Sequence, residues 1–234
     1  MKAIVLAAGR GERMRPLTDH TPKALLKVRG KPLIEWHLEA LARAGVRDVV
    51  VNTAWLEEQI VAALGDGARF GLRIAYSMEG RDHGGALETA GGLKKALPLL
   101  EGGSDAGRSF WYVAADVFAP AFEFDLHAVQ AFERSDEWAR LWMVPNPLQH
   151  PLGDFGVRAG LAVAGAGSER LTWSGIGLFR PAFVSELMQD LAPGAKGRLR
   201  PYLDAAMAHG HLGATPYSGL WADVGTPERL AALQ

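Results

Sequence analysis

The sequence predicts an α/β fold with a mostly parallel central sheet, followed by a smaller and less regular C-terminal lobe. Three observations support this prediction. Apolar residues make up 48% of the 234 positions, so the chain can bury a substantial core. Strand-like and helix-like segments alternate through the first half, which is typical of βαβ units. Short apolar runs broken by glycines occupy residues 153–180, which favours β-hairpins added to the sheet.

The strands expected in the first half are short runs rich in β-branched and aromatic residues, and they lie at 3–7, 46–51, 72–76 and 110–114. A first helix is expected between Pro32 and Gly45, because Ile34, Leu38 and Leu41 recur on one helical face. Two further helices are expected at 55–64 and at 87–97, the second ended by Pro98. The segment 101–109 has the composition of a loop.

The second half of the chain is expected to be less regular than the first. A strand is expected at 141–144, and helices are expected at 126–133, 181–190, 200–208 and 227–233. No internal repeat and no linker-like stretch divides the chain. We therefore expect residues 1–234 to form a single domain.

Composition and charge exclude several classes of protein. The chain has no run of 18 or more apolar residues, so no transmembrane helix is predicted. Gly9 and Arg10 interrupt the N-terminal apolar stretch too early for a signal peptide. The absence of cysteine excludes disulfides, thiolate metal sites and a cysteine nucleophile. A net charge of −1 argues against a nucleic-acid partner. We expect a cytoplasmic protein with no membrane partner, and the sequence leaves the oligomeric state open.

Positive charge is concentrated near the N-terminus, directly after the first predicted strand. Residues 1–32 hold eight of the 25 basic residues and only two of the 26 acidic ones. Gly9 and Gly11 lie in the same stretch, and glycine lets bare backbone N–H groups approach a phosphate. This pattern indicates a focused anion site, although a solvated charged loop would give the same charge count.

The common phosphate-binding motifs do not fit this loop. A Walker loop needs its second glycine five positions after Gly9, and a dinucleotide fingerprint needs its third glycine at the same position. This position holds Met14. The acidic residue that would hold a ribose about 20 positions further on is also missing. The sequence therefore supports neither a P-loop NTPase nor an NAD-dependent enzyme.

Two aspartates follow apolar, strand-like runs. Asp116 ends the run "FWYVAAD" and Asp223 lies in "LWADVGTPERL". Carboxylates at the carboxyl ends of strands can hold Mg²⁺ against phosphate oxygens. Each aspartate could instead cap the turn that follows its strand, and the residues alone leave both readings open.

Other candidate sites have weaker support. His209 and His211 are spaced as metal ligands could be, but no third partner is evident. Ser174 lies in "TWSGIG", which lacks the G-x-S-x-G pattern of a hydrolase nucleophile.

The motifs taken together resemble those of the sugar-1-phosphate nucleotidyltransferases. The stretch "LAAGRGERMRPLT" at 6–18 and "PKAL" at 22–25 look like the family's N-terminal signature. Matching motifs follow in the family's order, namely "LETAGG" at 87–92, Asp116, "SGIGLF" at 174–179 and "WADVGT" at 221–226. The resemblance covers nearly the whole chain.

The resemblance implies a Rossmann-like three-layer α/β/α nucleotidyltransferase fold, with a nucleotide-binding part at 1–125 and a sugar-binding part at 126–234. It also implies a Mg²⁺-dependent reaction between a nucleoside triphosphate and a sugar 1-phosphate that releases pyrophosphate. Arg13 and Lys23 match the family's catalytic cations, and Asp116 and Asp223 match its metal-binding pair. Further positions match the nucleotide site, namely Ala7, Ala8, Gly9, Gly11, Glu79, Glu88 and Thr89. Ser174 and Gly175 match the loop that meets the sugar.

Within the family, the resemblance implies UTP as the donor and N-acetylmuramate 1-phosphate as the acceptor. The lactyl carboxylate of that acceptor needs a cation, for which Arg158 and Arg170 are the candidates. Two departures from the family pattern are Ala114-Ala115 in place of Asn-Gly before Asp116, and a longer loop at 80–87. No residue in 153–173 matches the family lysine that meets the sugar phosphate.

Two alternatives remain from the sequence. One is a sister enzyme with another base, such as a mannose-1-phosphate guanylyltransferase. The other is a non-catalytic nucleotide-sugar-binding protein, which the change at Ala114-Ala115 would permit.

Overall fold

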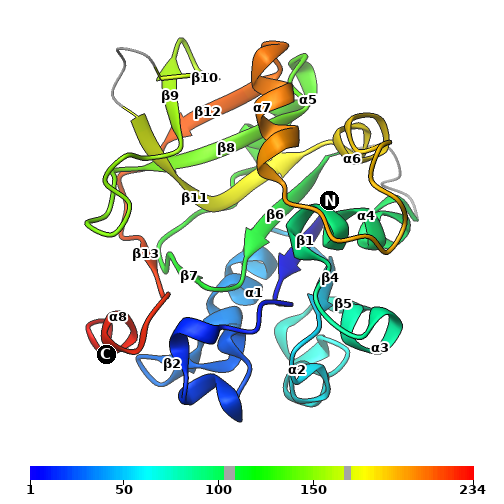
Figure 1. Cartoon of the computed structure of the whole chain (residues 1–234), viewed down its shortest axis with the longest axis vertical. Helices are drawn as coiled ribbons and strands as arrows, with labels where there is room; N and C mark the ends of the chain where they lie inside the picture. The colour runs from blue at the N-terminus through cyan, green and yellow to red at the C-terminus, as the bar shows by residue number, and fades with distance from the viewer. Residues whose placement is uncertain (103–108, 166–169) are drawn as a thin grey trace.

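In the computed structural model, which describes residues 1–102, 109–165 and 170–234, the described chain folds around one nine-stranded sheet (Figure 1). The strands lie in the order β5-β4-β1-β6-β11-β8-β12-β10-β9. Their bounds are β1 Lys2–Leu6, β4 Asp48–Thr53, β5 Arg73–Met78, β6 Phe110–Ala114, β8 Ala139–Val144, β9 Phe155–Arg158, β10 Leu161–Val163, β11 Arg170–Phe179 and β12 Leu212–Pro216. Strands β5, β4, β1 and β6 are parallel, and β11 runs antiparallel to both β6 and β8. The predicted parallel sheet with hairpins added is confirmed.

The helices alternate with the strands of the first half and cover the sheet. Their bounds are α1 Leu33–Arg43, α2 Glu57–Leu64, α3 Glu79–His83, α4 Glu88–Glu101, α5 Leu126–Arg134, α6 Pro181–Leu187, α7 Arg200–Ala208 and α8 Pro227–Ala231. Four 3₁₀ turns are η1 Glu12–Met14, η2 Leu17–Asp19, η3 Lys23–Leu25 and η4 Ala68–Phe70 among the described residues. Two small two-stranded sheets pair β2 Lys27–Val28 with β3 Lys31–Pro32, and β7 Val117–Phe118 with β13 Ala222–Asp223.

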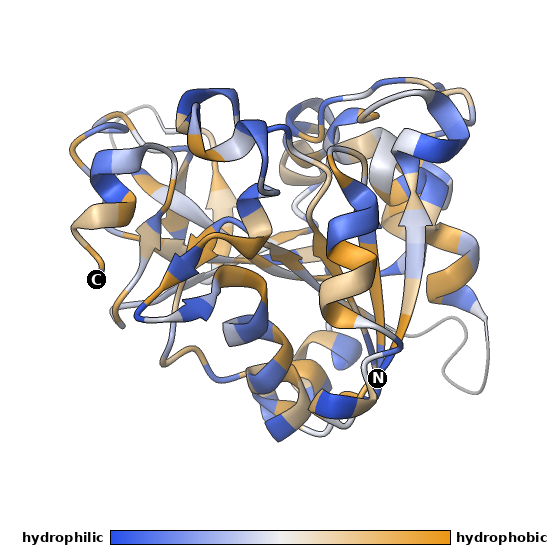
Figure 2. Ribbon diagram, turned by 90° about the horizontal axis from the view of Figure 1, so that it is seen from below, coloured by the Kyte–Doolittle hydropathy of each residue, from blue (hydrophilic) through white to orange (hydrophobic). Residues whose placement is uncertain are grey.

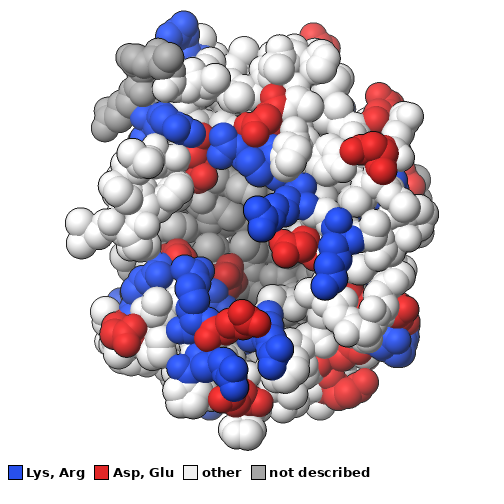
Figure 3. Space-filling model, viewed as in Figure 1, with Lys and Arg blue, Asp and Glu red and all other residues white. Residues whose placement is uncertain are grey.

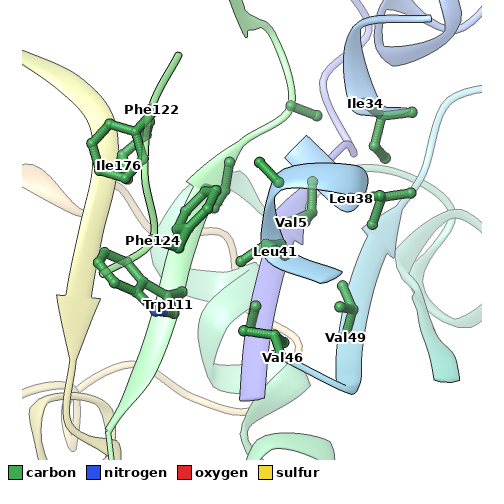
Figure 4. Packing of buried hydrophobic residues seen from close by; sticks show 14 of the residues in the cluster. Val5, Ile34, Leu38, Leu41, Val46, Val49, Trp111, Phe122, Phe124 and Ile176 are labelled. Carbon is green, nitrogen blue, oxygen red and sulfur yellow. The ribbon is translucent and has the colours of Figure 1, made fainter. Parts of the chain in front are cut away.

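Alternating residues of the central strands point to opposite faces, which makes the fold three-layered. In β1, Val5 packs into the cluster that contains α1, α2 and α5, whereas Ile4 packs into the cluster that contains α4, α6 and α7. Figure 4 shows Leu38 and Leu41 of α1 lying beside Val5 and Val49. Figure 2 shows the hydrophobic residues concentrated in the strands in the middle of the molecule.

The C-terminal segment returns to the N-terminal region. Figure 1 places α8 next to β2, and the Gln234 side chain donates a hydrogen bond to the Lys27 carbonyl at 3.1 Å. Val224 and Leu230 join Met14 and Val28 in a separate buried cluster. The end of the chain is thereby held against the N-terminal loop.

The structure differs from the expected elements at α4 and at β12, and one expected loop lies partly outside the described residues. Helix α4 continues through Pro98 to Glu101, since burial of Leu100 with Leu93 outweighs the hydrogen bond that the proline removes. Strand β12 was not predicted. Of the loop expected at 101–109, residues 103–108 lie outside the described residues. Within the described ranges, no helix is long and apolar enough to cross a bilayer.

Candidate active site

A cleft of about 1320 Å³ opens at the carboxyl ends of β1, β4 and β6, where Leu6, Asn52 and Ala114 line it. In open α/β sheets this edge is the usual place for a ligand. Figure 3 shows Lys and Arg side chains on both sides of the hollow in this face. Nine of the predicted site residues line the cleft, namely Ala7, Ala8, Gly9, Gly11, Arg13, Lys23, Glu88, Thr89 and Asp116.

The glycine loop after β1 has a defined shape. The Ala7 N–H donates to the Asn52 side-chain oxygen at 2.8 Å, which ties the loop to β4. Gly11 has a φ of +66°, and a Cβ there would lie 2.9 Å from the Thr18 methyl group and 3.3 Å from Lys23 Cβ. A side chain at position 11 would be strained and crowded. Nothing lies within 4 Å of the corresponding Cβ position at Gly9, so this glycine faces open space.

The arginines of this loop have different surroundings. The Arg10 guanidinium lies 4.5 Å from the centre of the Trp55 ring, and Arg15 pairs with Asp19 at 2.6 Å. Arg13 is exposed and lines the cleft, and within the described part of the chain its side chain has no hydrogen bond or ion pair. Arg13 is therefore available to an anionic ligand.

Lys23 and Asp116 form an ion pair in the cleft. The Lys23 ammonium lies 2.6 Å from the Asp116 carboxylate, and the lysine side chain is only 10% exposed. The carboxylate is more open, with 44% of the side chain exposed. A largely buried lysine is positioned with little freedom, so its charge has a fixed place beside the cleft.

Asp116 lines the cleft, and Asp223, which does not line it, lies on the neighbouring segment. Asp223 pairs with Val117 in the β7–β13 ladder, and the Val224 N–H donates to the Asp116 carbonyl at 3.1 Å. The Asp223 carboxylate forms an ion pair with Arg229 and is 28% exposed. No group of three or more His, Asp or Glu side chains in the described ranges could hold a metal ion alone. The two aspartates would supply at most two protein carboxylates to a metal ion.

Glu79 does not line the cleft and lies beneath it, fully buried. Its carboxylate accepts from the Asn52 side chain at 2.5 Å and from the Leu87 N–H at 2.7 Å. Burial raises the pKa of Glu79, and these two hydrogen bonds act in the opposite direction. The carboxylate thus links the end of β4 to the start of α4. Its predicted contact with the nucleotide stays untested, and the observed geometry favours an indirect, positioning role.

The two glycines of "LETAGG" make room for neighbours of α4. A Cβ at Gly92 would lie 2.6 Å from the Glu79 carboxylate oxygen, and one at Gly91 would collide with the Ala195 carbonyl oxygen. Glu88, at the start of the helix, has a φ of +60°, an uncommon conformation for a residue with a side chain. This turn directs Glu88 and Thr89 to the cleft.

Ser174 and Gly175 lie beside the cleft but do not line it. Ser174 is fully buried, and its carbonyl accepts from the Trp221 ring N–H at 2.9 Å. Gly175 has a φ of +79°, and a Cβ there would lie 3.0 Å from the Ala114 methyl group. Ala115 lines the cleft but is only 1% exposed, and it also belongs to the buried cluster around α1. The predicted contact of Ser174 and Gly175 with a sugar is not tested by this geometry.

The cleft is also lined by residues that the sequence did not indicate, among them Lys196 and Asn52. Lys196 lines the cleft from the segment between α6 and α7, and Asn52 lines it from the end of β4. A lysine in a glycine-rich loop carries no periodic signal. Asn52 could have been suspected as a polar residue that follows the apolar run of β4.

The remaining candidate residues lie outside the cleft. His209 and His211 both pack against the Trp138 ring, with ring centres 5.6 and 4.5 Å away, and no acidic partner completes a metal site among the described residues. Arg170 donates to the Asp154 carbonyl at 2.5 Å, and Arg158 is exposed on β9. Neither arginine lines the cleft, so the geometry does not support them as the cations that meet an acidic sugar.

Sequence and structure comparisons relate the chain to known proteins. Residues 2–158 match the family model described as nucleotidyl transferase. The chain is 44% identical to an N-acetylmuramate α-1-phosphate uridylyltransferase of Neisseria meningitidis serogroup B, over 100% of this chain and 97% of the relative. A Caulobacter vibrioides protein of the same name is 36% identical, with 98% and 94% of the two chains covered.

A solved structure has the same fold. It is a Bacillus anthracis protein assigned as a glucose-1-phosphate thymidylyltransferase and crystallised with sucrose, and it superposes with a TM-score of 0.84 at 21% identity. The match covers 100% of this chain and 93% of that protein. At this identity the likeness concerns the fold alone.

Proposed function

The chain belongs to the nucleotidyl transferase family, and from this premise we propose that it transfers the uridylyl group of UTP to N-acetylmuramate 1-phosphate. Pyrophosphate is the second product. Two relatives named for this activity match over nearly their whole lengths, which supports the choice of base and sugar. The proposal includes nucleotide binding by residues 1–125, sugar binding by residues 126–234, a cytoplasmic location and a role in peptidoglycan recycling.

The position of the Lys23–Asp116 pair is the observation that carries the proposal. An acceptor phosphate oxygen attacks the α-phosphorus of UTP, the bond from that phosphorus to the bridging oxygen breaks, and pyrophosphate leaves with the electron pair. Negative charge gathers on the α-phosphate in the transition state. The Lys23 ammonium, held beside Asp116 at 2.6 Å, stabilises that charge from a fixed position.

Other residues of the cleft would bind and orient the substrates. The backbone N–H groups around Gly9 and Gly11 face the triphosphate, and Arg13 holds the departing pyrophosphate. Ala7, Ala8, Glu88 and Thr89 surround the base and ribose. Ser174 and Gly175 contribute to the sugar side through the loop that Trp221 fixes.

Asp116 and Asp223 would hold Mg²⁺ in this proposal. When bound, the ion neutralises charge on phosphate oxygens and orients them. The fit rests on two observations. The aspartates lie on paired segments, and both carboxylates are partly exposed toward solvent. Mg²⁺ commonly takes one or two protein carboxylates and completes its sphere with phosphates and water.

A substrate panel tests the proposal. Purified protein with Mg²⁺ is supplied with UTP, GTP, CTP or dTTP and with the 1-phosphates of N-acetylmuramate, N-acetylglucosamine, glucose or mannose, and pyrophosphate release is measured. UTP with N-acetylmuramate 1-phosphate should give the highest kcat/KM. Comparable rates with GTP, or faster turnover of mannose 1-phosphate, would support a guanylyltransferase instead. Substrate binding without any pyrophosphate release would support the non-catalytic alternative.

A further inference from the structure

A second, smaller pocket adjoins the main cleft. It has a volume of about 300 Å³ and shares Glu88 and Thr89 with the cleft. Its other walls come from the C-terminal half of the chain, namely Asp154, Phe155, Trp173, Arg198, Leu199, Arg200 and Leu203. A ligand that occupies the main cleft can therefore extend one substituent around the start of α4 into this pocket.

The segment 192–199 contains Lys196 and Arg198, and backbone hydrogen bonds anchor it to α4. The Ala90 N–H donates to the Gly197 carbonyl at 2.8 Å, and the Gly197 N–H donates to the Leu87 carbonyl at 3.0 Å. Gly91 permits this approach, because a side chain there would meet the Ala195 carbonyl. Lys196 lines the main cleft, and Arg198, two positions later, lines the smaller pocket.

Arg198 is uncommitted, whereas the other charged groups on the C-terminal side of the pocket have partners. The Arg200 guanidinium stacks 4.5 Å from the centre of the Phe155 ring and donates to Asp204 at 2.8 Å. Asp154 accepts from the Trp173 N–H at 2.8 Å. Arg198 is exposed, and within the described residues its side chain makes no hydrogen bond or ion pair.

The remaining acid of the pocket lies at its border. Glu88 lines both cavities and also has no hydrogen bond or ion pair among the described residues. Asp154 is partly neutralised by Arg200, at 3.9 Å, and lies 3.2 Å from His150. Arg198 is consequently the charged group in this pocket that is free to bind an anion.

We propose that the smaller pocket binds the carboxylate of an acidic acceptor sugar through Arg198, while Lys196 meets the sugar phosphate from the cleft side. This inference rests on the proposed function and deepens it. The Cα atoms of residues two apart in a chain are at most about 7 Å apart, so the two cations can meet two anionic groups of one small ligand. A planar guanidinium matches a carboxylate in shape and charge. Arg198 thereby takes the role expected above for Arg158 or Arg170.

The test compares two acceptors that differ by the lactyl ether alone. With UTP, kcat/KM is measured for N-acetylmuramate 1-phosphate and for N-acetylglucosamine 1-phosphate. Arg198→Gln should lower kcat/KM for the muramate by about 10- to 100-fold, chiefly through KM, as the loss of a charged hydrogen bond typically does. The value for the glucosamine should change by less than about threefold. Arg198→Lys should retain part of the preference, because it keeps the charge.

Arg158→Gln is the matched control, since Arg158 is an exposed arginine outside both cavities. It should leave both acceptors unaffected. An equal loss for both acceptors in Arg198→Gln, or no loss for either, would overturn the carboxylate pocket while leaving the uridylyltransferase proposal intact. A wild-type protein that does not turn over the muramate at all would contradict both.

Discussion

The Lys23 ammonium lies 2.6 Å from the Asp116 carboxylate, although 93 positions separate the two residues in the chain. The contact joins the turn η3, which begins at Lys23, to the segment that directly follows β6. It places a cation and a carboxylate together where the proposed reaction gathers negative charge.

Lys23→Ala should lower kcat by on the order of 10² to 10³, as removal of one charge-stabilising donor typically does. Steady-state kinetics at saturating UTP measures the effect. Lys27→Ala is the control, because Lys27 is exposed and outside the cleft. An unchanged kcat with a raised KM would show that Lys23 only binds substrate.

Asp223→Asn should nearly abolish turnover while the protein remains folded. The variant keeps the shape of the side chain but removes one of two carboxylates that would hold Mg²⁺. Thermal unfolding checks the fold, and a Mg²⁺ titration of activity checks the metal dependence. Asp136→Asn serves as a control for an exposed aspartate. Equal activity with and without divalent metal in the wild type would contradict the metal assignment.

Gly91→Ala should displace the segment 192–199, because the new methyl group would meet backbone rather than a flexible side chain. We expect a loss of about 1–3 kcal/mol in the free energy of unfolding, as for other overpacked sites. KM for the acceptor sugar should rise more than KM for UTP, since Lys196 and Arg198 move with the segment. Gly102→Ala is the control, because its nearest contact would be an ordinary 3.5 Å. Unchanged acceptor kinetics would separate the segment from sugar binding.

Glu79 should make stability depend on pH. Burial raises the pKa of this carboxyl above its ordinary value of 4.5. Between 4.5 and the raised value, the folded protein holds a proton that the unfolded chain has released, so stability falls as pH rises through this window. Glu79→Gln cannot titrate and should show a shallower decline. Urea unfolding of both proteins between about pH 4.5 and 7 measures the difference. Parallel curves for the two proteins would refute this account.

The elements with a clear apolar pattern could be predicted from the sequence. The run of Ile4, Val5 and Leu6 and the recurrence of Ile34, Leu38 and Leu41 identified β1 and α1, and both elements are present. Strand β12 was missed because Gly213 and Pro216 weaken its five-residue pattern. Its place beside β8 is set by tertiary packing, which a local pattern does not contain.

The site was predictable where a motif marked it. Gly11, Lys23 and Asp116 lie in recognisable motifs, and the structure brings them to one cleft. Lys196 and Arg198 were not predicted, since exposed basic residues in a loop have no period and no fixed spacing to the other motifs. The packing of their segment on Gly91, together with its backbone hydrogen bonds to α4, brings them to the cavities.

A single competition experiment identifies the nucleotide sugar that the protein prefers to form. UTP and GTP at equal concentrations, together with N-acetylmuramate 1-phosphate and mannose 1-phosphate at equal concentrations, are incubated with the protein and Mg²⁺. Mass spectrometry then identifies the nucleotide sugars formed at low conversion. We expect UDP-N-acetylmuramate to be the dominant product. A mixture dominated by GDP-mannose, or one with no nucleotide sugar, would contradict it.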